Sequence, residues 1–413
     1  MNYSKVVNLG IVACPGGEAF CDTIVDYLKR NYTAKHRQKV DLIAKVYGMT
    51  RDEAEARVNL QSDILDPDNF DPNKDIHTYE CPEFKIPTKC TRFANGEFKT
   101  EILSSVRGMD VFIIQDCENH YPIDVNGDGK KHVLSVPDHA FILFATIDAV
   151  IQSGARSVSV VIPVYPFARQ HERKGREALT ASLFGRILEY MGVKKIITLD
   201  IHSKEIENSF NRLRMENLHA SYQIIRELSE LVDLEDENLV IVSPDTGAVD
   251  RNKFYANNLN KPLALIYKER DYSKVTGDAK STNIVSMKLL GNVKGKTVFM
   301  ADDMLGTGGT LIEAMKHLKA EGAEKIICAI SLPLFTGKAI ESFDEAYKQG
   351  YFTKLIGTNA VYHGDDLLSK EWYVSASVSD LFARIISRLH QNRPITPVVD
   401  NKMIIQQLIQ SKK

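Results

Sequence analysis

The feature with the clearest chemistry is a pair of adjacent carboxylates followed by a loop of small residues. Residues 298–310 read Val-Phe-Met-Ala-Asp-Asp-Met-Leu-Gly-Thr-Gly-Gly-Thr, which predicts a buried strand that ends at Asp302 and Asp303. Carboxylates at that place hold sugar hydroxyls or a metal ion, and free N–H groups of a Gly/Thr turn surround a phosphate. We therefore expect a sugar-phosphate site, whose loop residues are Thr307, Gly308, Gly309 and Thr310.

The segment after this loop predicts a helix. Leu311, Met315 and Leu318 fall on one face, Thr310 is the expected N-cap and Gly322 stands where the helix would stop. A helix N-terminus favours an anion. Gly and Thr are also common in ordinary strand–turn–helix junctions, but two acids beside an anion cradle need a polyol or metal partner.

Two more candidate groups follow other apolar runs. Arg169 and Gln170 open a basic segment that extends to Arg176, which is either a solvated surface loop or a clamp for polyphosphate oxygens. His202 and Asp245 are each ambiguous alone. Together they could supply the one or two protein ligands that nucleotide-bound magnesium takes.

A third group consists of cations. Lys268 and Arg270 precede the polar segment 271–286, which predicts a mobile lid, although a surface strand end would look similar. A lid of this kind would bring positive charge to transferred phosphoryl oxygens only during the reaction.

The elements that must position these residues alternate between strand and helix. Short apolar, β-branched runs occur at 6–12, 111–115, 158–164, 196–201, 239–242, 263–266, 297–300, 326–332 and 355–361. Amphipathic stretches of helical length lie at 139–153, 179–191, 221–231, 311–320 and 378–389. Alternation of this kind predicts parallel sheets covered by helices on both faces, with ligands beyond the carboxyl ends of the strands.

Two segments interrupt the pattern and are interpreted as insertions. Residues 35–88 are charged and rich in Pro and Asp, with a possible helix at 44–60. The shorter insertion, 118–132, contains Asp-Val-Asn-Gly-Asp-Gly, the first half of a calcium loop. Ser135 stands where the bidentate Glu of such a loop belongs, which argues against calcium.

Composition sets the broad class. The 413 residues suffice for two domains, and the 52 basic and 54 acidic residues argue against a nucleic-acid surface. The six cysteines form no CxxC pair, which favours a reducing compartment. The N-terminus does not read as a signal peptide and no apolar run is long enough to cross a bilayer. We expect a cytoplasmic protein whose partners are small molecules, with no nucleic acid and no membrane.

Seven segments, in chain order, resemble the ribose-phosphate pyrophosphokinases (phosphoribosyl pyrophosphate synthases). The resemblance covers most of residues 1–20 and 89–390. The segments are Arg92-Phe93-Ala-Asn95-Gly-Glu97, Ser105-Val-Arg107-Gly, Tyr165-Pro-Phe-Ala-Arg169-Gln170, Thr198-Leu-Asp200-Ile-His202, Val242-Ser-Pro-Asp245, Tyr267-Lys268-Glu-Arg270 and 302–310.

The resemblance implies an α/β fold of two phosphoribosyltransferase-like domains, 1–214 and 215–413, each a mainly parallel sheet flanked by helices. It implies transfer of the β,γ-diphosphoryl group of ATP to O1 of ribose 5-phosphate, which yields 5-phosphoribosyl 1-pyrophosphate and AMP for nucleotide biosynthesis. It also implies Mg²⁺ as cofactor and self-association into a homo-oligomer, a hexamer in many such proteins.

The same resemblance gives each candidate residue a role. Asp302 and Asp303 would hold ribose hydroxyls, and the loop 307–310 the 5-phosphate. Lys268 and Arg270 would act on the transition state. Arg169 and Gln170 are implied to contact ATP, and Phe93, Asn95 and Glu97 to hold the adenine of ATP that is bound by a neighbouring subunit. The implied magnesium ligands are His202 and Asp245.

The chain departs from the family pattern at several places. Gly306 replaces an acid of the loop, His171 replaces an Asp, and 207–210 differs in a region that forms allosteric sites in many members. ADP inhibition and phosphate activation therefore do not follow. Two alternatives share parts of the pattern: a non-catalytic synthase-associated regulatory subunit, and a phosphoribosyltransferase that consumes phosphoribosyl pyrophosphate.

Overall fold

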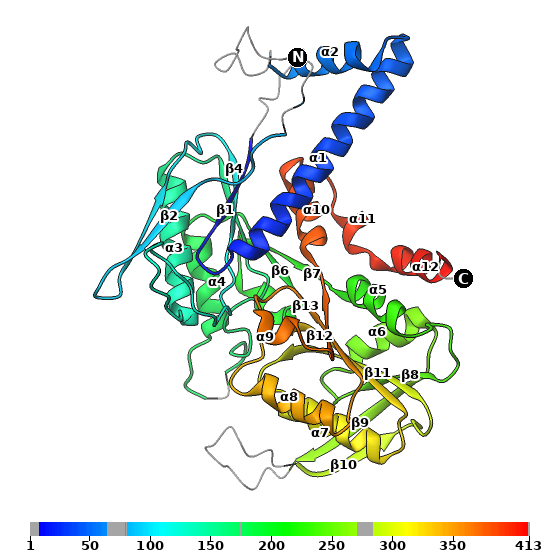
Figure 1. The fold of residues 1–413 in the computed structure, drawn as a ribbon. Helices are drawn as coiled ribbons and strands as arrows, with labels where there is room; N and C mark the ends of the chain where they lie inside the picture. Colours follow the sequence, from blue (N-terminus) through cyan, green and yellow to red (C-terminus); the bar gives the residue numbers. More distant parts are fainter. Residues whose placement is uncertain (1–7, 64–78, 80, 174, 271–283, 412–413) are drawn as a thin grey trace.

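The computed structural model describes residues 8–63, 79, 81–173, 175–270 and 284–411. Among these residues, no helix has both the length and the apolar character needed to span a membrane. The chain forms two α/β units, each built around its own sheet. A two-stranded hairpin lies at one side of the molecule, and a long helix projects from the other (Figure 1).

The N-terminal sheet has five strands, all parallel, in the order β1-β4-β5-β6-β7. Its strands are β1 (Leu9–Ala13), β4 (Asp110–Ile114), β5 (Ser157–Val161), β6 (Lys195–Leu199) and β7 (Arg214–Leu218). The helices α3 (Val136–Gln152) and α4 (Thr180–Tyr190) bury apolar faces beside it. The edge of β1 is covered, because Ile11 bonds through its backbone to Phe84 and Ile86 at 2.7 and 2.8 Å.

The C-terminal sheet has seven strands in the order β10-β9-β8-β11-β12-β13-β14, parallel except for β10. They are β8 (Leu239–Ser243), β9 (Leu263–Arg270), β10 (Ile284–Leu290), β11 (Thr297–Leu305), β12 (Lys325–Pro333), β13 (Lys354–Thr358) and β14 (Tyr373–Ala376). Its helices are α6 (Val249–Leu259), α7 (Gly309–Ala320), α8 (Ala339–Lys348) and α9 (Asp365–Leu368). Two mainly parallel sheets with helices confirm the predicted fold class.

The first insertion is organised differently from the prediction. The helix expected at 44–60 is wrong, because α1 (Glu18–Tyr47) ends at Gly48, which has a φ of 64°, and α2 (Arg51–Asp63) starts anew. The new start has a capping box: the carboxylate of Glu53 accepts from the backbone N–H of Thr50 at 2.9 Å, and the hydroxyl of Thr50 accepts from the backbone N–H of Glu53 at 3.3 Å. Residues 64–78 and 80 of the insertion lie outside the described residues.

Two helices that join the sheets come from opposite ends of the chain. One continuous cluster of buried apolar residues includes Ile24 and Leu28 of α1 and Phe382 and Ile385 of α10 (Ser379–His390). The remaining helices are α5 (Ser221–Leu231), α11 (Thr396–Val399), α12 (Asn401–Ser411) and the 3₁₀ helix η2 (Lys204–Ser209). Since β7 belongs to the N-terminal sheet, we propose that the domain boundary follows Leu218 and not residue 214.

Candidate active site

The two acids lie on a strand that extends past its neighbour. β11 pairs with β8 only as far as Phe299, whereas its pairing with β12 continues to Leu305. The prediction that the strand ends at Asp302 and Asp303 is therefore wrong, because one neighbour keeps the ladder going. Beyond Phe299, β11 no longer pairs with β8, and both acids line the cavity described below.

The phosphate-type loop is held by glycine. The helix α7 has Gly308 as its N-cap, with a φ of 76°, so the prediction that Thr310 is the cap is wrong. A Cβ atom on Gly308 would lie 2.3 Å from Cε2 of Phe343, which is fully buried. Only glycine meets both conditions, and the first turn of α7 consequently presents the N–H groups of Gly309 and Thr310 without a side-chain cap.

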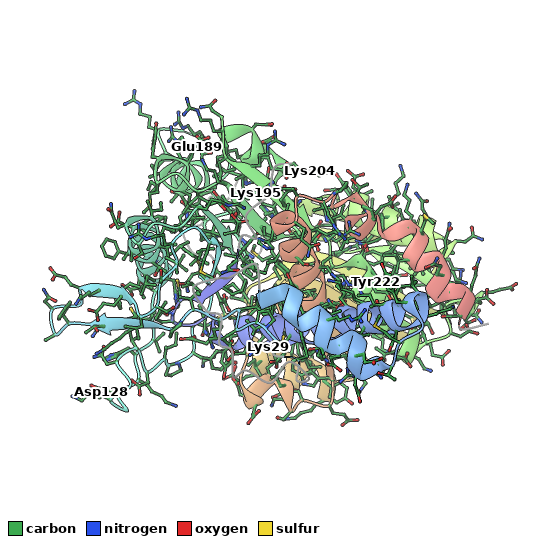
Figure 2. All side chains as sticks on the ribbon, turned by 90° about the horizontal axis from the view of Figure 1, so that it is seen from above. Lys29, Asp128, Glu189, Lys195, Lys204 and Tyr222 are labelled. Carbon is green, nitrogen blue, oxygen red and sulfur yellow. The ribbon has the colours of Figure 1, made fainter. Side chains whose placement is uncertain are left out.

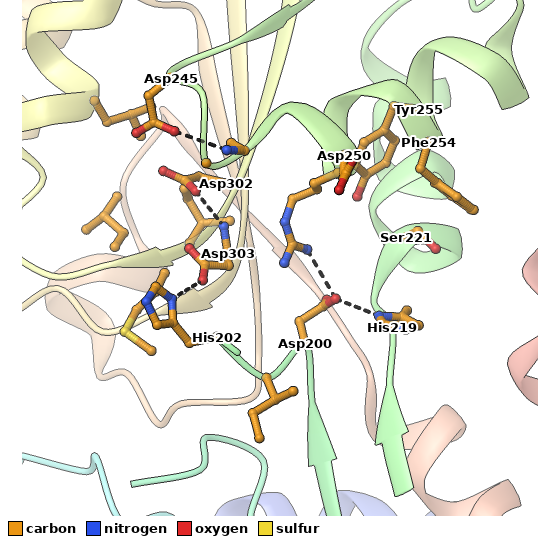
Figure 3. A pocket seen from close by; sticks show the side chains of 18 of the residues that line it. Asp200, His202, His219, Ser221, Asp245, Asp250, Phe254, Tyr255, Asp302 and Asp303 are labelled. Atoms are coloured by element: carbon orange, nitrogen blue, oxygen red, sulfur yellow. Dashed lines mark hydrogen bonds and ion pairs between the residues drawn. The ribbon is translucent and has the colours of Figure 1, made fainter. Parts of the chain in front are cut away.

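Residues from both sheets line one cavity of about 1050 Å³ around this loop (Figure 3). Of the predicted site residues, it contains Asp302, Asp303, Thr307, Gly308, Gly309, Thr310, Arg169, His202 and Asp245. The structure thus brings residues from separate strand ends together around one cavity. Gln170 is exposed and is not among the described lining residues.

The acids of the cavity have opposite protonation tendencies. Burial, then the charges of Asp303 and Asp245, raise the pKa of Asp302 to about 7. Burial also opposes ionisation of Asp303, but a 2.6 Å hydrogen bond with Nδ1 of His202 and the charges of His202 and Arg251 together outweigh burial, so the pKa of Asp303 is lowered. The same bond raises the pKa of His202. The cavity thus holds one stable carboxylate and one that gains its charge near neutral pH.

This arrangement predicts a pH-dependent gain in stability for Asp302→Asn. A carboxyl whose pKa rises from 3.8 to about 7 on folding favours the fold fully below pH 3.8, and that contribution is lost as the pH rises toward 7. Asparagine carries no charge at either end of the range. In metal-free buffer we expect a gain of about 1 kcal/mol or more at pH 8 relative to pH 4, measured by urea unfolding. Equal gains at both pH values would contradict this assignment.

The side chains fit a magnesium ion shared with a ligand. Magnesium prefers oxygen ligands, keeps several waters and takes one or two protein groups. Asp302 is buried beside the negative charges of Asp303 and Asp245, and these three effects raise its pKa, so a cation there would be favoured. With Nδ1 of His202 bonded to Asp303, Nε2 is left as the ligand atom, as in many metal-binding histidines. The described part of the chain contains no cluster of three or more ligating side chains, so an ion there would complete its coordination with oxygens of water or substrate.

A second charged network joins the two sheets below this cluster, and sequence inspection missed most of it. Asp200 is buried, has a φ of 40°, and bonds Arg251 of α6 at 3.1 Å and His219 at 2.8 Å (Figure 3). Burial opposes the ionisation of Asp200, but Arg251 and then His219 lower its pKa well below the usual value. Arg251 also donates to Ser331 at 3.2 Å. The sequence analysis named only Asp200 of this network, within the segment 198–202 that resembles the family.

The predicted lid cations lie in a strand. β9 extends through Arg270, with Lys268 opposite Met287 and Arg270 opposite Ile284 of β10. The backbone of both cations is therefore part of a strand end, the alternative to a mobile loop, because the antiparallel pairing with β10 continues to Arg270. Residues 271–283 of the predicted lid, and Lys174 of the basic segment, lie outside the described residues.

The segment with Phe93, Asn95 and Glu97 forms the tip of a hairpin made of β2 (Thr88–Arg92) and β3 (Phe98–Ile102). The backbone of Phe93 bonds the carbonyl of Glu97 at 2.8 Å, and the Asn95 side chain accepts from Glu97 N–H at 3.2 Å. All three side chains are exposed, and none is among the described residues that line the cavity.

Comparison with known proteins first defines the class. Residues 212–364 match the model of the phosphoribosyl transferase domain, and residues 80–192 match the N-terminal domain of ribose phosphate pyrophosphokinase. The solved phosphoribosylpyrophosphate synthetase from Mycobacterium smegmatis has the same fold, with a TM-score of 0.66 at 23% identity over 93% of this chain and 99% of that one. The chain is thus built of two domains of the phosphoribosyltransferase class.

Curated relatives narrow the class to one family. The ribose-phosphate pyrophosphokinase of Chlorobaculum tepidum is 31% identical over 78% of this chain and 89% of its own length. That of Bacillus subtilis is 32% identical over 75% and 88%, respectively. The chain belongs to the ribose-phosphate pyrophosphokinase family.

Proposed function

We propose that the protein is a ribose-phosphate diphosphokinase, which transfers the β,γ-diphosphoryl group of ATP to O1 of ribose 5-phosphate and releases AMP. The supporting observation is the convergence on one cavity of the sugar-phosphate loop, from one sheet, with Arg169 and His202, from the other. A site for sugar phosphate alone would not need the second group. Membership of the family supports the same conclusion.

The proposed mechanism is positioning combined with charge neutralisation. Asp302 and Asp303 orient the ribose hydroxyls, and the 307–310 loop holds the 5-phosphate, so that O1 lies in line with the β-phosphorus. Lys268 and Arg270 stabilise charge on the transferred group. Magnesium bound by His202 and Asp245 would neutralise phosphate oxygens. No covalent intermediate is required.

We further propose that Arg169 and Gln170 contact ATP and that Phe93, Asn95 and Glu97 hold the adenine of ATP bound to a neighbouring subunit. The exposed hairpin tip supports this division, because those residues are separate from the cavity of their own chain. The protein would then act as a cytoplasmic homo-oligomer, with a hexamer as the expected size.

The test is product analysis of the purified protein with ATP, Mg²⁺ and ribose 5-phosphate, with and without inorganic phosphate. We expect AMP and phosphoribosyl pyrophosphate in equal amounts, and no AMP when ribose 5-phosphate is omitted. Absence of AMP under both phosphate conditions would contradict the proposal and favour the non-catalytic subunit. Release of pyrophosphate that depends on a nucleobase and forms no AMP would favour the phosphoribosyltransferase.

A further inference from the structure

The loop 118–132, between β4 and α3, lies outside the cavity and has no role in the mechanism above. It is held rigidly by its own bonds. Both oxygens of Asp124 accept backbone N–H groups, from Gly127 and Gly129 at 2.8 Å each. Ile123 and His132 form a two-bond antiparallel bridge, also at 2.8 Å, and Val125 is buried in the N-terminal core.

The middle of this loop is hydrogen-bonded to the hairpin β2–β3. Oδ1 of Asn126 accepts from the backbone N–H of Arg92 at 2.7 Å, and its Nδ2 donates to the carbonyl of the same residue at 3.1 Å. Arg92 is the last residue of β2 and directly precedes Phe93. Figure 2 shows Asp128, from the same turn, beside the hairpin at the edge of the molecule. The side-chain amide of Asn126 thus pairs with both backbone groups of Arg92, as the backbone of a neighbouring strand would.

The start of the loop is hydrogen-bonded to the C-terminal domain. The hydroxyl of Tyr121 donates to the carboxylate of Asp366 in α9, with 2.8 and 3.0 Å to its two oxygens. Just before the loop, the buried carboxylate of Asp116 accepts from the backbone N–H of Tyr362 at 2.8 Å. The loop therefore bridges the hairpin and the domain that carries Asp302 and Asp303.

We propose that the loop 118–132 is a brace that positions the adenine-contacting tip, and that Asn126 is its positioning residue. This inference rests on the role proposed above for Phe93, Asn95 and Glu97. A two-stranded hairpin is marginally ordered on its own, and ordering an exposed tip when ligand binds would cost affinity. Two hydrogen bonds at Arg92 remove part of that cost in advance, for ATP and not for ribose 5-phosphate.

The test is Asn126→Ala in the full-length protein, with Lys130→Ala as control, since Lys130 is exposed in the same loop and its side chain is not part of the hydrogen bonding to the hairpin. We expect Asn126→Ala to raise the KM for ATP about fivefold or more, from the loss of two hydrogen bonds. The kcat, the KM for ribose 5-phosphate and the oligomer size should stay as in the control. Tyr121→Phe should raise the KM for ATP in the same direction.

Hydrogen exchange gives a readout that does not depend on activity. The amides of Phe93 and Gly96 are bonded within the tip, and they should exchange faster in Asn126→Ala than in Lys130→Ala. An unchanged KM for ATP in an active enzyme would overturn the inference, as would equal increases in both KM values or a smaller oligomer. If the wild-type protein forms no AMP, the proposed function fails, and exchange rates alone then decide whether the brace orders the tip.

Discussion

Replacement of Lys268 with alanine is expected to lower kcat by about 10²–10³-fold, while the KM for ribose 5-phosphate changes by less than about twofold. A cation that meets the transferred diphosphoryl group mainly in the transition state contributes little to binding of the ground state. Lys268 lies in β9, the strand beside β8, after which Asp245 follows. The last pair between these two strands is Ser243 opposite Leu265, so Asp245 and Lys268 both follow at the same end of the sheet.

Lys288→Ala is a matched control for this experiment. Lys288 is exposed on β10, where it pairs with Tyr267, so it has the same residue type and lies one rung away in the same two strands. Its loss should leave kcat near the wild-type value. If both variants lost activity equally, the effect would come from the general positive charge of the strands β9 and β10. If Lys268→Ala changed only the KM, the residue would be a binding group and not a catalytic one.

The second large effect is expected for Gly308→Ala. The backbone of Gly308 has a φ of 76°, which costs a non-glycine residue about 1 kcal/mol. The added Cβ would also lie 2.3 Å from Phe343, and overpacking of this kind costs about 1–3 kcal/mol. We expect the loop to shift, the KM for ribose 5-phosphate to rise about tenfold or more, and the free energy of unfolding to fall by about 2 kcal/mol.

Gly306→Ala separates this effect from a general intolerance of the loop. A Cβ on Gly306 would lie 3.5 Å from the guanidinium of Arg169 and from Oγ1 of Thr336, which is ordinary contact. It should therefore change the free energy of unfolding by far less than Gly308→Ala. Urea unfolding and steady-state kinetics on both variants give the comparison. A wild-type KM for ribose 5-phosphate in Gly308→Ala would remove this turn from the phosphate cradle.

The regular elements were predictable where burial is local and periodic. The run at 239–242 and the helix at 221–231 correspond to β8 and α5, because strands buried on both faces and amphipathic helices carry their pattern in consecutive residues. The hairpin β2–β3 was not predicted as strands. Of its ten residues only Cys90 is buried, and the hairpin contacts α3 and is bonded by Asn126, both distant in the sequence.

The candidate site, too, has features that a short segment of sequence reveals and features that depend on distant residues. Asp302, Asp303 and the Gly/Thr turn were found from the sequence, because a strand end, two acids and a helix start lie within one short segment. The N-cap was misplaced at Thr310. The requirement for glycine at Gly308 comes from Phe343, which is 35 positions away by number yet in contact.

The sequence by itself determined the family, the class of both domains and the identities of the candidate site residues, because those depend on residue types at short, ordered spacings. Only the tertiary structure decided which of them share a cavity, that His202 and Asp303 are hydrogen-bonded, and that Arg251 is paired with Asp200. The physical reason is that pKa values and ion pairs depend on burial and on separations of a few ångströms between strand ends. Those separations are set by how the two sheets pack, which no local pattern encodes.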